Sequence, residues 1–541
     1  MIVRKSRGRV GVSCSPTEPL LSLKDIEIAS NAKIYLETYF DRILASQSPR
    51  SLRRRSVERL IKELSLGSTE AATCWEEWRA KETEYLRRCR TRLHIGDFDT
   101  LRIIGKGSFG CVKLARMENG KGGVFALKIV QKGLQLKQGQ EAHLRAERDL
   151  LVAGEGSRWI VPLVASFQDD ENLYLAMEYM IGGDFLGLLM EKGTLSEEMA
   201  RFYVAEMVLC IEEVHKLGFI HRDVKPEDNF CITASGHLKI CDFGLAFSGH
   251  WAHDGAYFEQ QRWGLVKKTQ VSVVGDTIDK RTGNALARAL SATTATVPHG
   301  ERVLSWRNKN GRRRMARSIV GTYQYMVSGP KIAQAPEIVR EEAYDARCDW
   351  WSLGILFGYT PFYAENREES KIKVSNWRDH LVLDPTTHLS KKMETLIRSL
   401  ICEREGRLGS IAYRINDASD CLPNYVYPND AEEIRAHPFF AVVNWRTLHM
   451  QIPPFVPSGL LDEADTKYFT ESFNSRSTSG ESSDAVPQVR ARDMLLRDSK
   501  CGEKILEARK RGAFLGYTYV RPGNVRVRKG LLAYYDSARR N

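Results

Sequence analysis

The tightest constraint on this chain comes from two short motifs, His221-Arg222-Asp223-Val224-Lys225-Pro226 and Asp242-Phe243-Gly244. Nineteen residues lead from Asp223 to Asp242, enough for two short strands that bring both carboxylates to one place. Phosphoryl transfer needs little covalent help from a protein, so its site supplies positioning and charge. We expect Asp223 to accept or orient the proton of a substrate hydroxyl and Lys225 to stabilise the transferred phosphoryl group. Asp242 would hold Mg²⁺ against the β- and γ-oxygens of ATP.

A glycine-rich turn and a strand with a lysine precede these motifs. Residues 105–112 follow the pattern GxGxxGxV, and strands are predicted on both sides of the turn. Glycines let backbone amides approach phosphates, whereas a dinucleotide-binding turn would open a helix. Lys128 follows on the next strand and can neutralise the α- and β-phosphates. Its expected partner is Glu147 of the following helix, with Glu141 as the rival carboxylate.

The apolar periodicity divides the chain. Residues 1–29 are expected to be a disordered basic N-terminus, and residues 30–95 show helical spacing in two stretches with Arg53-Arg54-Arg55 between them. From Phe98 the period changes to two, which predicts strands, and the chain is then mostly helical to Phe440. Residues 441–541 form a tail of little periodicity. The order of elements predicts an α+β fold.

Composition excludes several classes of protein. The eleven cysteines are scattered singly, which favours free thiols in a reducing compartment over disulfides or zinc. The sequence contains no run of about eighteen apolar residues, so no transmembrane helix is predicted. The net charge of +12 is concentrated in the first ninety residues and in the run 307–317, without an aromatic pattern for RNA, so nucleic acid is not an expected partner. We expect a cytoplasmic protein, with nuclear or cortical pools as further locations.

Residues 98–440 resemble eukaryotic protein kinases. Trp159, Gly182-Gly183-Asp184, Asp349-Trp350-Trp351-Ser352 and the tail are similar to the AGC group, and within it to the NDR/LATS family in its fungal form. The resemblance implies a bilobal fold with a β-rich N-lobe, an α-rich C-lobe, an N-terminal helical regulatory segment and an AGC tail. It also implies an ATP- and Mg²⁺-dependent serine/threonine kinase of protein substrates, active in cell morphogenesis or cell-cycle signalling.

The resemblance further implies which residues form the nucleotide and metal sites. The second metal ligand beside Asp242 is Asn229, or Asp228 in its place, because one extra residue near Glu227 shifts the family's asparagine. Both side chains offer oxygen to Mg²⁺, and we favour Asn229. The expected ATP-binding residues are Ile104, Gly105, Lys106, Gly107, Ser108, Phe109, Gly110, Cys111, Val112, Lys128, Glu178, Met180 and Asp184.

Region 30–95 is the first of three features that favour the NDR/LATS family. In that family such a region binds a Mob co-activator, whose surface is acidic. Tyr35, Tyr39, the arginines at 53–55 and Arg87-Arg88 suit this role. The alternative is a helical hairpin that packs on itself.

The other two features are regulatory. In the family, the activation segment is extended and ends in a basic, autoinhibitory run. Segment 245–334 of this chain, with its basic run 307–317, matches that description. Without the resemblance, the run would equally suggest nuclear localisation or nucleic-acid binding. Ser318 stands at the phosphoserine position and could pair with Arg222. Residues 514–519 resemble the hydrophobic motif, with Thr518 as the target of an upstream kinase. Phe514 and Tyr517 would dock beside the helix that bears Glu147.

Two further departures weaken the match. The segment Val327–Gln334 intervenes before Ala335-Pro336-Glu337, and roughly five residues of a buried helix, about 7 Å, are missing after Leu356. Glu337 should still pair with Arg407. Exon-boundary errors in a gene model would explain these departures. If they are real, the alternative is a catalytically impaired pseudokinase scaffold that binds a Mob-type partner.

Overall fold

The computed structural model describes most of the two lobes and parts of the regulatory segments. The expected positions Ser108, Phe109, Asp228, Ser318 and the basic run 307–317 lie outside the described residues. The described residues are 21–45, 49–90, 92–107, 110–117, 123–225, 229–276, 324–326, 329–331, 334–355, 362, 364, 366–383, 389–417, 426–469 and 489–522.

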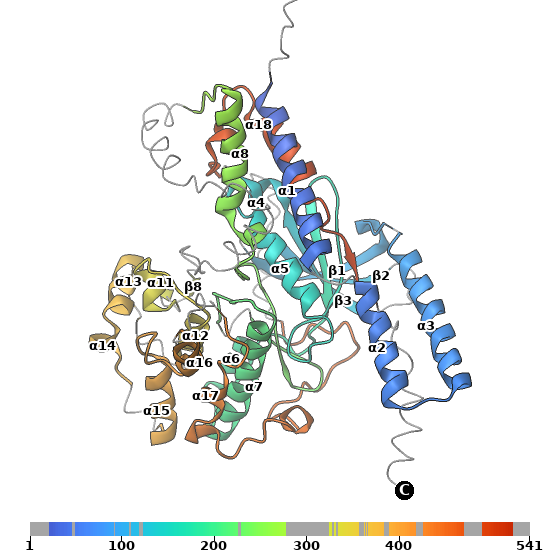
Figure 1. Ribbon diagram of the computed structural model, residues 1–541. Coiled ribbons are helices and arrows are strands. Elements are labelled where there is room, and N and C mark those ends of the chain that lie inside the picture. The colour runs from blue at the N-terminus through green and yellow to red at the C-terminus, as the bar shows by residue number, and fades with distance from the viewer. Residues whose placement is uncertain are drawn as a thin grey trace, which may run out of the picture.

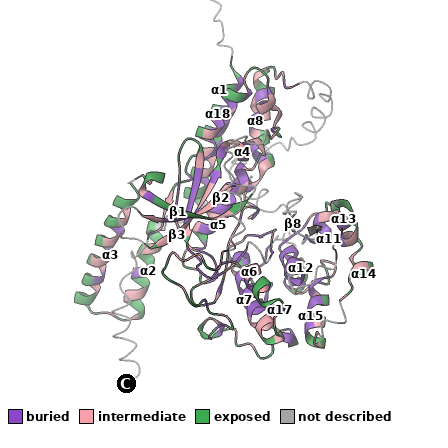
Figure 2. Ribbon diagram, turned by 180° about the vertical axis from the view of Figure 1, so that it is seen from behind, coloured by how far each residue is buried: buried purple, intermediate pink, exposed green. Residues whose placement is uncertain are grey.

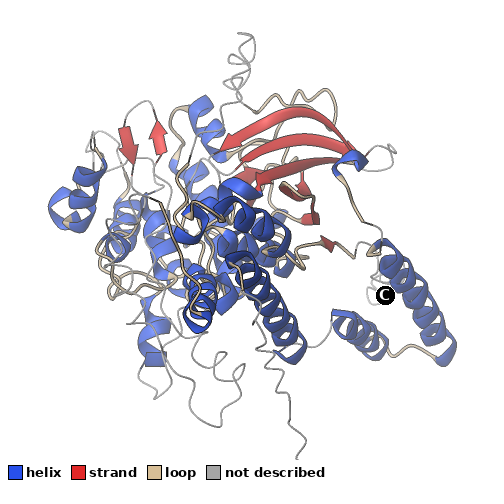
Figure 3. Ribbon diagram, turned by 90° about the horizontal axis from the view of Figure 1, so that it is seen from above, coloured by secondary structure: helices blue, strands red, loops and turns tan. Residues whose placement is uncertain are grey.

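The first lobe is an antiparallel sheet with helices against it (Figures 1 and 3). The strands run in the order β1-β2-β3-β5-β4-β10, so the last strand among the described residues joins the first lobe. Phe98, Phe167 and Tyr174 stack on one another with ring centroids 5.4 and 4.7 Å apart, which closes the sheet's apolar core. The elements are β1 (Phe98–Gly107), β2 (Gly110–Met117), β3 (Val124–Gln131), α4 (Lys132–Lys137), α5 (Glu141–Ala153), β4 (Leu163–Gln168), β5 (Asn172–Glu178) and β10 (Tyr519–Val520).

The second lobe is helical and surrounds α7, whose inner residues are buried (Figure 2). The α7 helix begins where the Ser196 hydroxyl accepts a hydrogen bond from the Met199 amide. Trp350 and Trp351 of α12 are fully buried and fill the core beside it. The elements are α6 (Phe185–Lys192), α7 (Glu197–Lys216), β6 (Phe230–Ile232), β7 (Leu238–Ile240), β8 (Gln324–Met326), β9 (Gly329–Lys331), α11 (Pro336–Val339), α12 (Arg347–Ile355), α13 (Arg367–Ser375), α14 (Trp377–His380), α15 (Lys391–Leu400), α16 (Ser410–Asp417) and α17 (Glu432–Arg435).

The N-terminal region holds three helices, α1 (Leu23–Ala45), α2 (Pro49–Glu63) and α3 (Ser68–Arg88). The expected disordered segment 1–29 is therefore wrong from Leu23 onward. The start of α1 is fixed locally, because the Asp25 amide donates to the Ser22 hydroxyl and the Ser22 amide donates to the Asp25 carboxylate. It is also fixed by packing, since Leu23 and Ile26 are buried against residues far along the chain.

The expected place of Arg53, Arg54 and Arg55 between two helical stretches is also wrong, because all three lie inside α2. Arginine is a good helix former, and Arg53 gives both a bidentate bond to Glu82 of α3 and a cation–π contact with Tyr85 at 4.6 Å. The α2–α3 hairpin thus packs on itself, and it stands apart from the body of the molecule (Figure 3).

Two further helices, outside the two lobes, pack beside α1. The α8 helix (Gly255–Thr269) belongs to the activation segment, and α18 (Gly502–Gly512) is a helix within the tail, which was expected to show little periodicity. Figure 1 shows α1, α8 and α18 side by side at one end of the first lobe. Among the described residues, no helix is long and apolar enough to cross a bilayer.

A buried ion cluster joins these helices to the first lobe. Arg262 of α8 lies 3.2 Å from Glu27 of α1 and 2.7 Å from Glu141 of α5. Arg509 of α18 lies 2.8 Å from Glu27 and 2.9 Å from Asp493. Because the interior screens charge poorly, each partner holds the others in place.

We predict that Arg53→Ala loosens the α2–α3 hairpin, because Glu82 is 2% exposed and would lose its charged donor. The expected cost is roughly 1–3 kcal/mol, read as faster amide hydrogen exchange across both helices. Arg54→Ala is the matched control, since its pair with Glu58 is largely exposed and should cost at most about 0.5 kcal/mol. Equal exchange in the two variants would contradict the prediction.

Candidate active site

The loop 221–225 is held in shape by a buried carboxylate of α12. The Asp349 carboxylate accepts hydrogen bonds from the backbone amides of His221 and Arg222, both at 2.8 Å, and it also contacts His215 at 2.9 Å. Arg222 and Asp242 both have positive φ, 69° and 57°, so the backbone is strained at both motifs. Fixing the two amides compensates for this strain and places the next residue, Asp223.

His215 links Asp349 to the far side of the second lobe. Its other ring nitrogen lies 3.0 Å from Asp430, and all three groups are fully buried or nearly so. Burial alone would lower the pKa of His215, but Asp430 and Asp349 outweigh it and raise the pKa to about 10. The imidazolium is therefore charged at neutral pH and offsets part of the negative charge of Asp349 and Asp430.

Lys128 lies between two carboxylates from different lobes. Its Nζ is 2.6 Å from Glu147 Oε1 of α5 and 2.9 Å from Asp242 Oδ1. Burial opposes the ammonium charge, yet Asp242 and Glu147 raise the pKa of Lys128. The rival Glu141 pairs with Arg262 instead and does not reach this lysine. The arrangement gives a permanent positive charge beside a carboxylate that can bind a cation.

Asp223, Lys225 and Asn229 form the opposite side of the site. Lys225 Nζ is 3.3 Å from Asp223 Oδ2, and the Lys225 amide donates to Asn229 Oδ1 at 2.7 Å. Asn229 is fully buried, and its carbonyl accepts from the amide of Cys241, the residue before Asp242. Asn229 and Asp242 thus lie on adjoining backbone. Magnesium binds few protein ligands and prefers oxygen, so these two side chains fit it as a donor set.

The glycine-rich turn approaches the sheet too closely for a side chain. A Cβ at Gly110 would lie 1.9 Å from the Ile129 carbonyl oxygen, whereas a Cβ at Gly107 would meet no atom within 4 Å. Cys111 and Val112 pair with Lys106 and Gly105 across the two strands. The two strands thus hold the described ends of this turn, Gly107 and Gly110, opposite each other.

The segment that joins the lobes carries the other expected ATP-binding residues. Glu178 ends β5 and lies 3.1 Å from Lys239, while Met180 is buried. Asp184 caps α6 by accepting from the Gly187 amide at 2.7 Å. The Gly182 amide donates to the Ile232 carbonyl at 3.0 Å, which fastens the segment onto β6.

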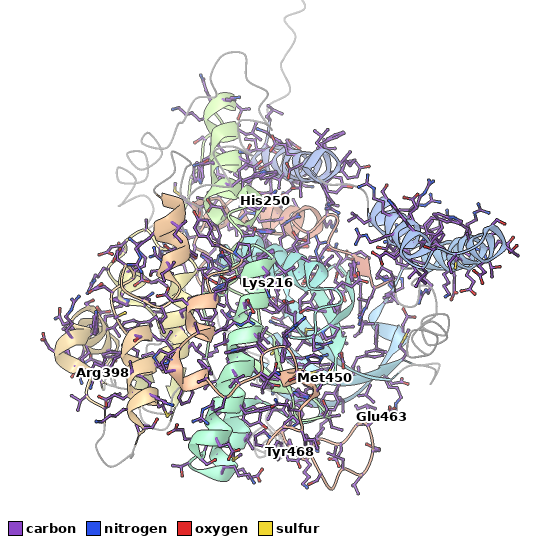
Figure 4. The ribbon with its side chains drawn as sticks, turned by 60° about the horizontal axis from the view of Figure 1, so that its bottom comes forward. Lys216, His250, Arg398, Met450, Glu463 and Tyr468 are labelled. Atoms are coloured by element: carbon purple, nitrogen blue, oxygen red, sulfur yellow. The ribbon has the colours of Figure 1, made fainter. Side chains whose placement is uncertain are left out.

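Tail residues that the sequence did not single out also reach this segment. The Tyr179 hydroxyl donates to the Asp465 carbonyl at 2.7 Å, and the Phe469 ring stacks on Tyr179 with centroids 5.5 Å apart. A Cβ at Gly183 would lie 2.4 Å from the Tyr468 carbonyl oxygen. Figure 4 shows Tyr468 on the tail as it passes over the lobes. Ile104 and Phe469 share an apolar cluster, so the tail contributes to the wall beside the glycine-rich turn.

The hydrophobic motif docks against α5 and β4. Phe514 and Tyr517 are 0% and 1% exposed. The Gln168 side chain donates to the Phe514 carbonyl at 2.9 Å, and the Ser166 hydroxyl donates to the Tyr517 carbonyl at 2.7 Å. Thr518 is exposed, directly before β10. The motif also contacts the helix that bears Glu147, since the Arg148 guanidinium lies 5.7 Å from the centroid of the Tyr517 ring, and it leaves Thr518 exposed.

The structure accommodates the departures in different ways. Arg407 donates to both Glu337 oxygens at 2.7 and 3.0 Å, so the predicted pair is confirmed. Residues 329–331 of the inserted segment form β9, which pairs with β8 just before it. The described part of α12 ends at Ile355 and keeps Asp349 in place.

Comparison with known proteins places this site in a family. Residues 98–258 match the protein kinase domain family. The chain is 40% identical to the serine/threonine-protein kinase cbk1 of Emericella nidulans, over 86% of this chain and 59% of that protein. It is 36% identical to CBK1 of Pneumocystis carinii, over 94% and 89% of the two chains, and 36% identical to tricornered of Drosophila melanogaster, over 82% and 87%.

The fold and site are those of a protein kinase domain. The chain belongs to the Cbk1/tricornered branch of the NDR/LATS family of serine/threonine protein kinases. It spans 59% of the length of the Emericella relative. The relatives are named as kinases, which supports the kinase interpretation and not the scaffold alternative.

We predict that Gly110→Ala destabilises the first lobe by about 1–3 kcal/mol, because the added methyl group would overlap the Ile129 carbonyl. Thermal unfolding should show a lower midpoint. Gly107→Ala, with open space around its Cβ, is the control and should unfold near the wild-type temperature. A midpoint for Gly110→Ala that matches the control would count against the close approach.

Proposed function

We propose that this chain is an active ATP-dependent serine/threonine protein kinase that phosphorylates protein substrates and acts in cell morphogenesis or cell-cycle signalling. The observation that carries the proposal is the ion triad of Lys128, Glu147 and Asp242, which joins α5 to the second motif. A scaffold would need the fold but not this arrangement of charge. The family membership supports the same activity.

Each side chain has a role that follows from its position. The Lys128 ammonium would bind the α- and β-phosphates of ATP, and Glu147 holds it there. Asp242 and Asn229 would hold Mg²⁺, whose charge offsets that of the phosphates. Asp223 orients the substrate hydroxyl and accepts its proton, while Lys225 beside it stabilises charge on the transferred group. The glycine-rich turn covers the phosphates with backbone amides.

We predict that Asp223→Ala lowers phosphate transfer by about 10²–10⁴-fold, because positioned general bases contribute that much. The measurement is incorporation of labelled γ-phosphate into a generic basic protein by the purified full chain. Asp170→Ala removes an exposed carboxylate of the β4–β5 turn and should leave the rate unchanged. Wild-type incorporation no greater than that of Asp223→Ala would overturn the proposed activity.

Regulation through the tail is part of the proposal. Thr518 is exposed between the buried Tyr517 and the strand β10, so an upstream kinase can reach its hydroxyl while the motif stays docked. Ser318 on the activation segment is a second proposed site, and it rests on the sequence alone. Mapping of phosphate on protein isolated from cells tests both sites, and unmodified Thr518 in active kinase would contradict its role.

We also assign a Mob-type, acidic co-activator to region 30–95. Arg53 is occupied within the α2–α3 hairpin, so the surface that remains is the apolar face of α1 beside the exposed arginines of α2. An apolar patch with basic neighbours fits a partner that is apolar at its centre and acidic around it. The exposed apolar residues of α1 are Ile28, Leu36, Tyr39, Phe40, Ile43 and Leu44.

We predict that Leu44→Asp weakens binding of a purified Mob-type protein by about tenfold or more, because it places a carboxylate in the apolar contact and repels an acidic partner. Titration calorimetry measures the change. Leu461→Asp is the matched control, since Leu461 is 93% exposed on the tail, away from α1. The assignment fails if both variants bind as the wild type does.

A further inference from the structure

Two cysteines lie in contact beneath the proposed nucleotide site. Cys231 belongs to β6 and Cys241 follows β7, and their sulfur atoms are 3.0 Å apart. Because Cys231 pairs with Lys239, Cys241 is its diagonal neighbour on the same face of the hairpin. A disulfide needs the two sulfurs at about 2.05 Å, so a shift of roughly 1 Å would join them.

The surroundings of the pair belong to the active site. The backbone of Cys231 bridges to Asp184, at the end of the segment between the lobes. Cys241 directly precedes Asp242, and its carbonyl receives the Asn229 side-chain amide at 3.5 Å. The pair therefore lies between the two ends of the proposed nucleotide site, the Asp184 end and the metal-binding end.

Both cysteine residues of this pair are partly accessible to solvent. Cys231 and Cys241 are partly exposed, whereas Cys74, Cys210 and Cys348 are buried. Among the described cysteines, Cys231 and Cys241 are the pair whose sulfur atoms are in contact. Dithiols in reducing compartments, when they oxidise, usually do so transiently in catalysis or sensing.

We propose that Cys231 and Cys241 form a reversible dithiol–disulfide modification site that closes the kinase to ATP under peroxide. One sulfur attacks a peroxide oxygen, which yields a sulfenic acid and water. The second sulfur then displaces the sulfenic oxygen as a second water. Overall, two thiols and one H₂O₂ give one disulfide and two H₂O, and exchange with a small dithiol reverses the reaction.

The disulfide changes the site in two ways. It joins Cys231, whose backbone bridges to Asp184, to Cys241 by a covalent bond, and it restrains the backbone next to Asp242, whose φ is positive. Nucleotide binding should therefore fall, and bound nucleotide should shield the pair. The effect on ATP rests on the proposed kinase function, whereas formation of the bond does not.

The test treats the full chain with H₂O₂ and follows two readouts. Digestion without reductant should give a peptide pair joined through Cys231 and Cys241, lighter by two hydrogens, that dithiothreitol separates. Affinity for a fluorescent ATP analogue should fall by about tenfold or more and return with dithiothreitol. Prior addition of MgATP should slow the cross-link.

Variants separate this pair from other thiols. Cys241→Ser should retain its nucleotide affinity after peroxide treatment, whereas Cys402→Ser, which removes a partly exposed thiol of the second lobe, should respond as the wild type does. Peroxide-treated wild type in which both cysteines remain alkylatable would overturn the site, even if Cys241→Ser fails to fold. A cross-link that leaves nucleotide affinity unchanged would overturn the control of ATP binding but keep the bond. Failure of the kinase assay alone would bear only on the proposed function.

Discussion

The Asp349 carboxylate is the contact on which the rest of the active site depends. It lies on a helix in the core of the second lobe and binds two backbone amides of the loop that carries Asp223. A buried carboxylate is costly unless it is fully paired, and His215 supplies the compensating charge from below. Asp349 and its charged partner His215 together hold the loop against the helical core. A shorter α12 is tolerable as long as it keeps this residue buried.

The second organising element is α5, which several distant segments hold in position. Its Glu147 binds Lys128, its Glu141 joins the ion cluster with Arg262, and its Arg145 donates to the Ala513 carbonyl. One helix therefore contacts the catalytic lysine, the activation segment and the tail. A change at any of these segments can reach Glu147 through a rigid body a few turns long, without a separate route for the signal.

The sequence predicted the parts of this molecule that are set by chemistry better than those set by packing. Phosphate and metal binding restrict Lys128, Asp223 and Asp242 to particular residue types, and the structure pairs Lys128 with Asp242 and Lys225 with Asp223. The periodicity of apolar residues did not reveal the start of α1, where Leu23 is buried in one cluster with Val266 and Ile505. Local patterns also could not reveal that Phe469 reaches Tyr179, because that contact joins residues almost three hundred positions apart. The capping pair Ser22 and Asp25 was the one local signal for α1, and it was readable.

The strand β10 also bears on contacts between separate copies of this chain, because it lies at the edge of the sheet. Without it, β4 would end the sheet with unpaired amides and carbonyls, next to the apolar surface that Phe514 and Tyr517 cover. Such a margin is a template on which another chain can add a strand. The tail therefore pairs with this margin in the folded chain, and the segment that positions α5 also occupies a place where another chain could add a strand.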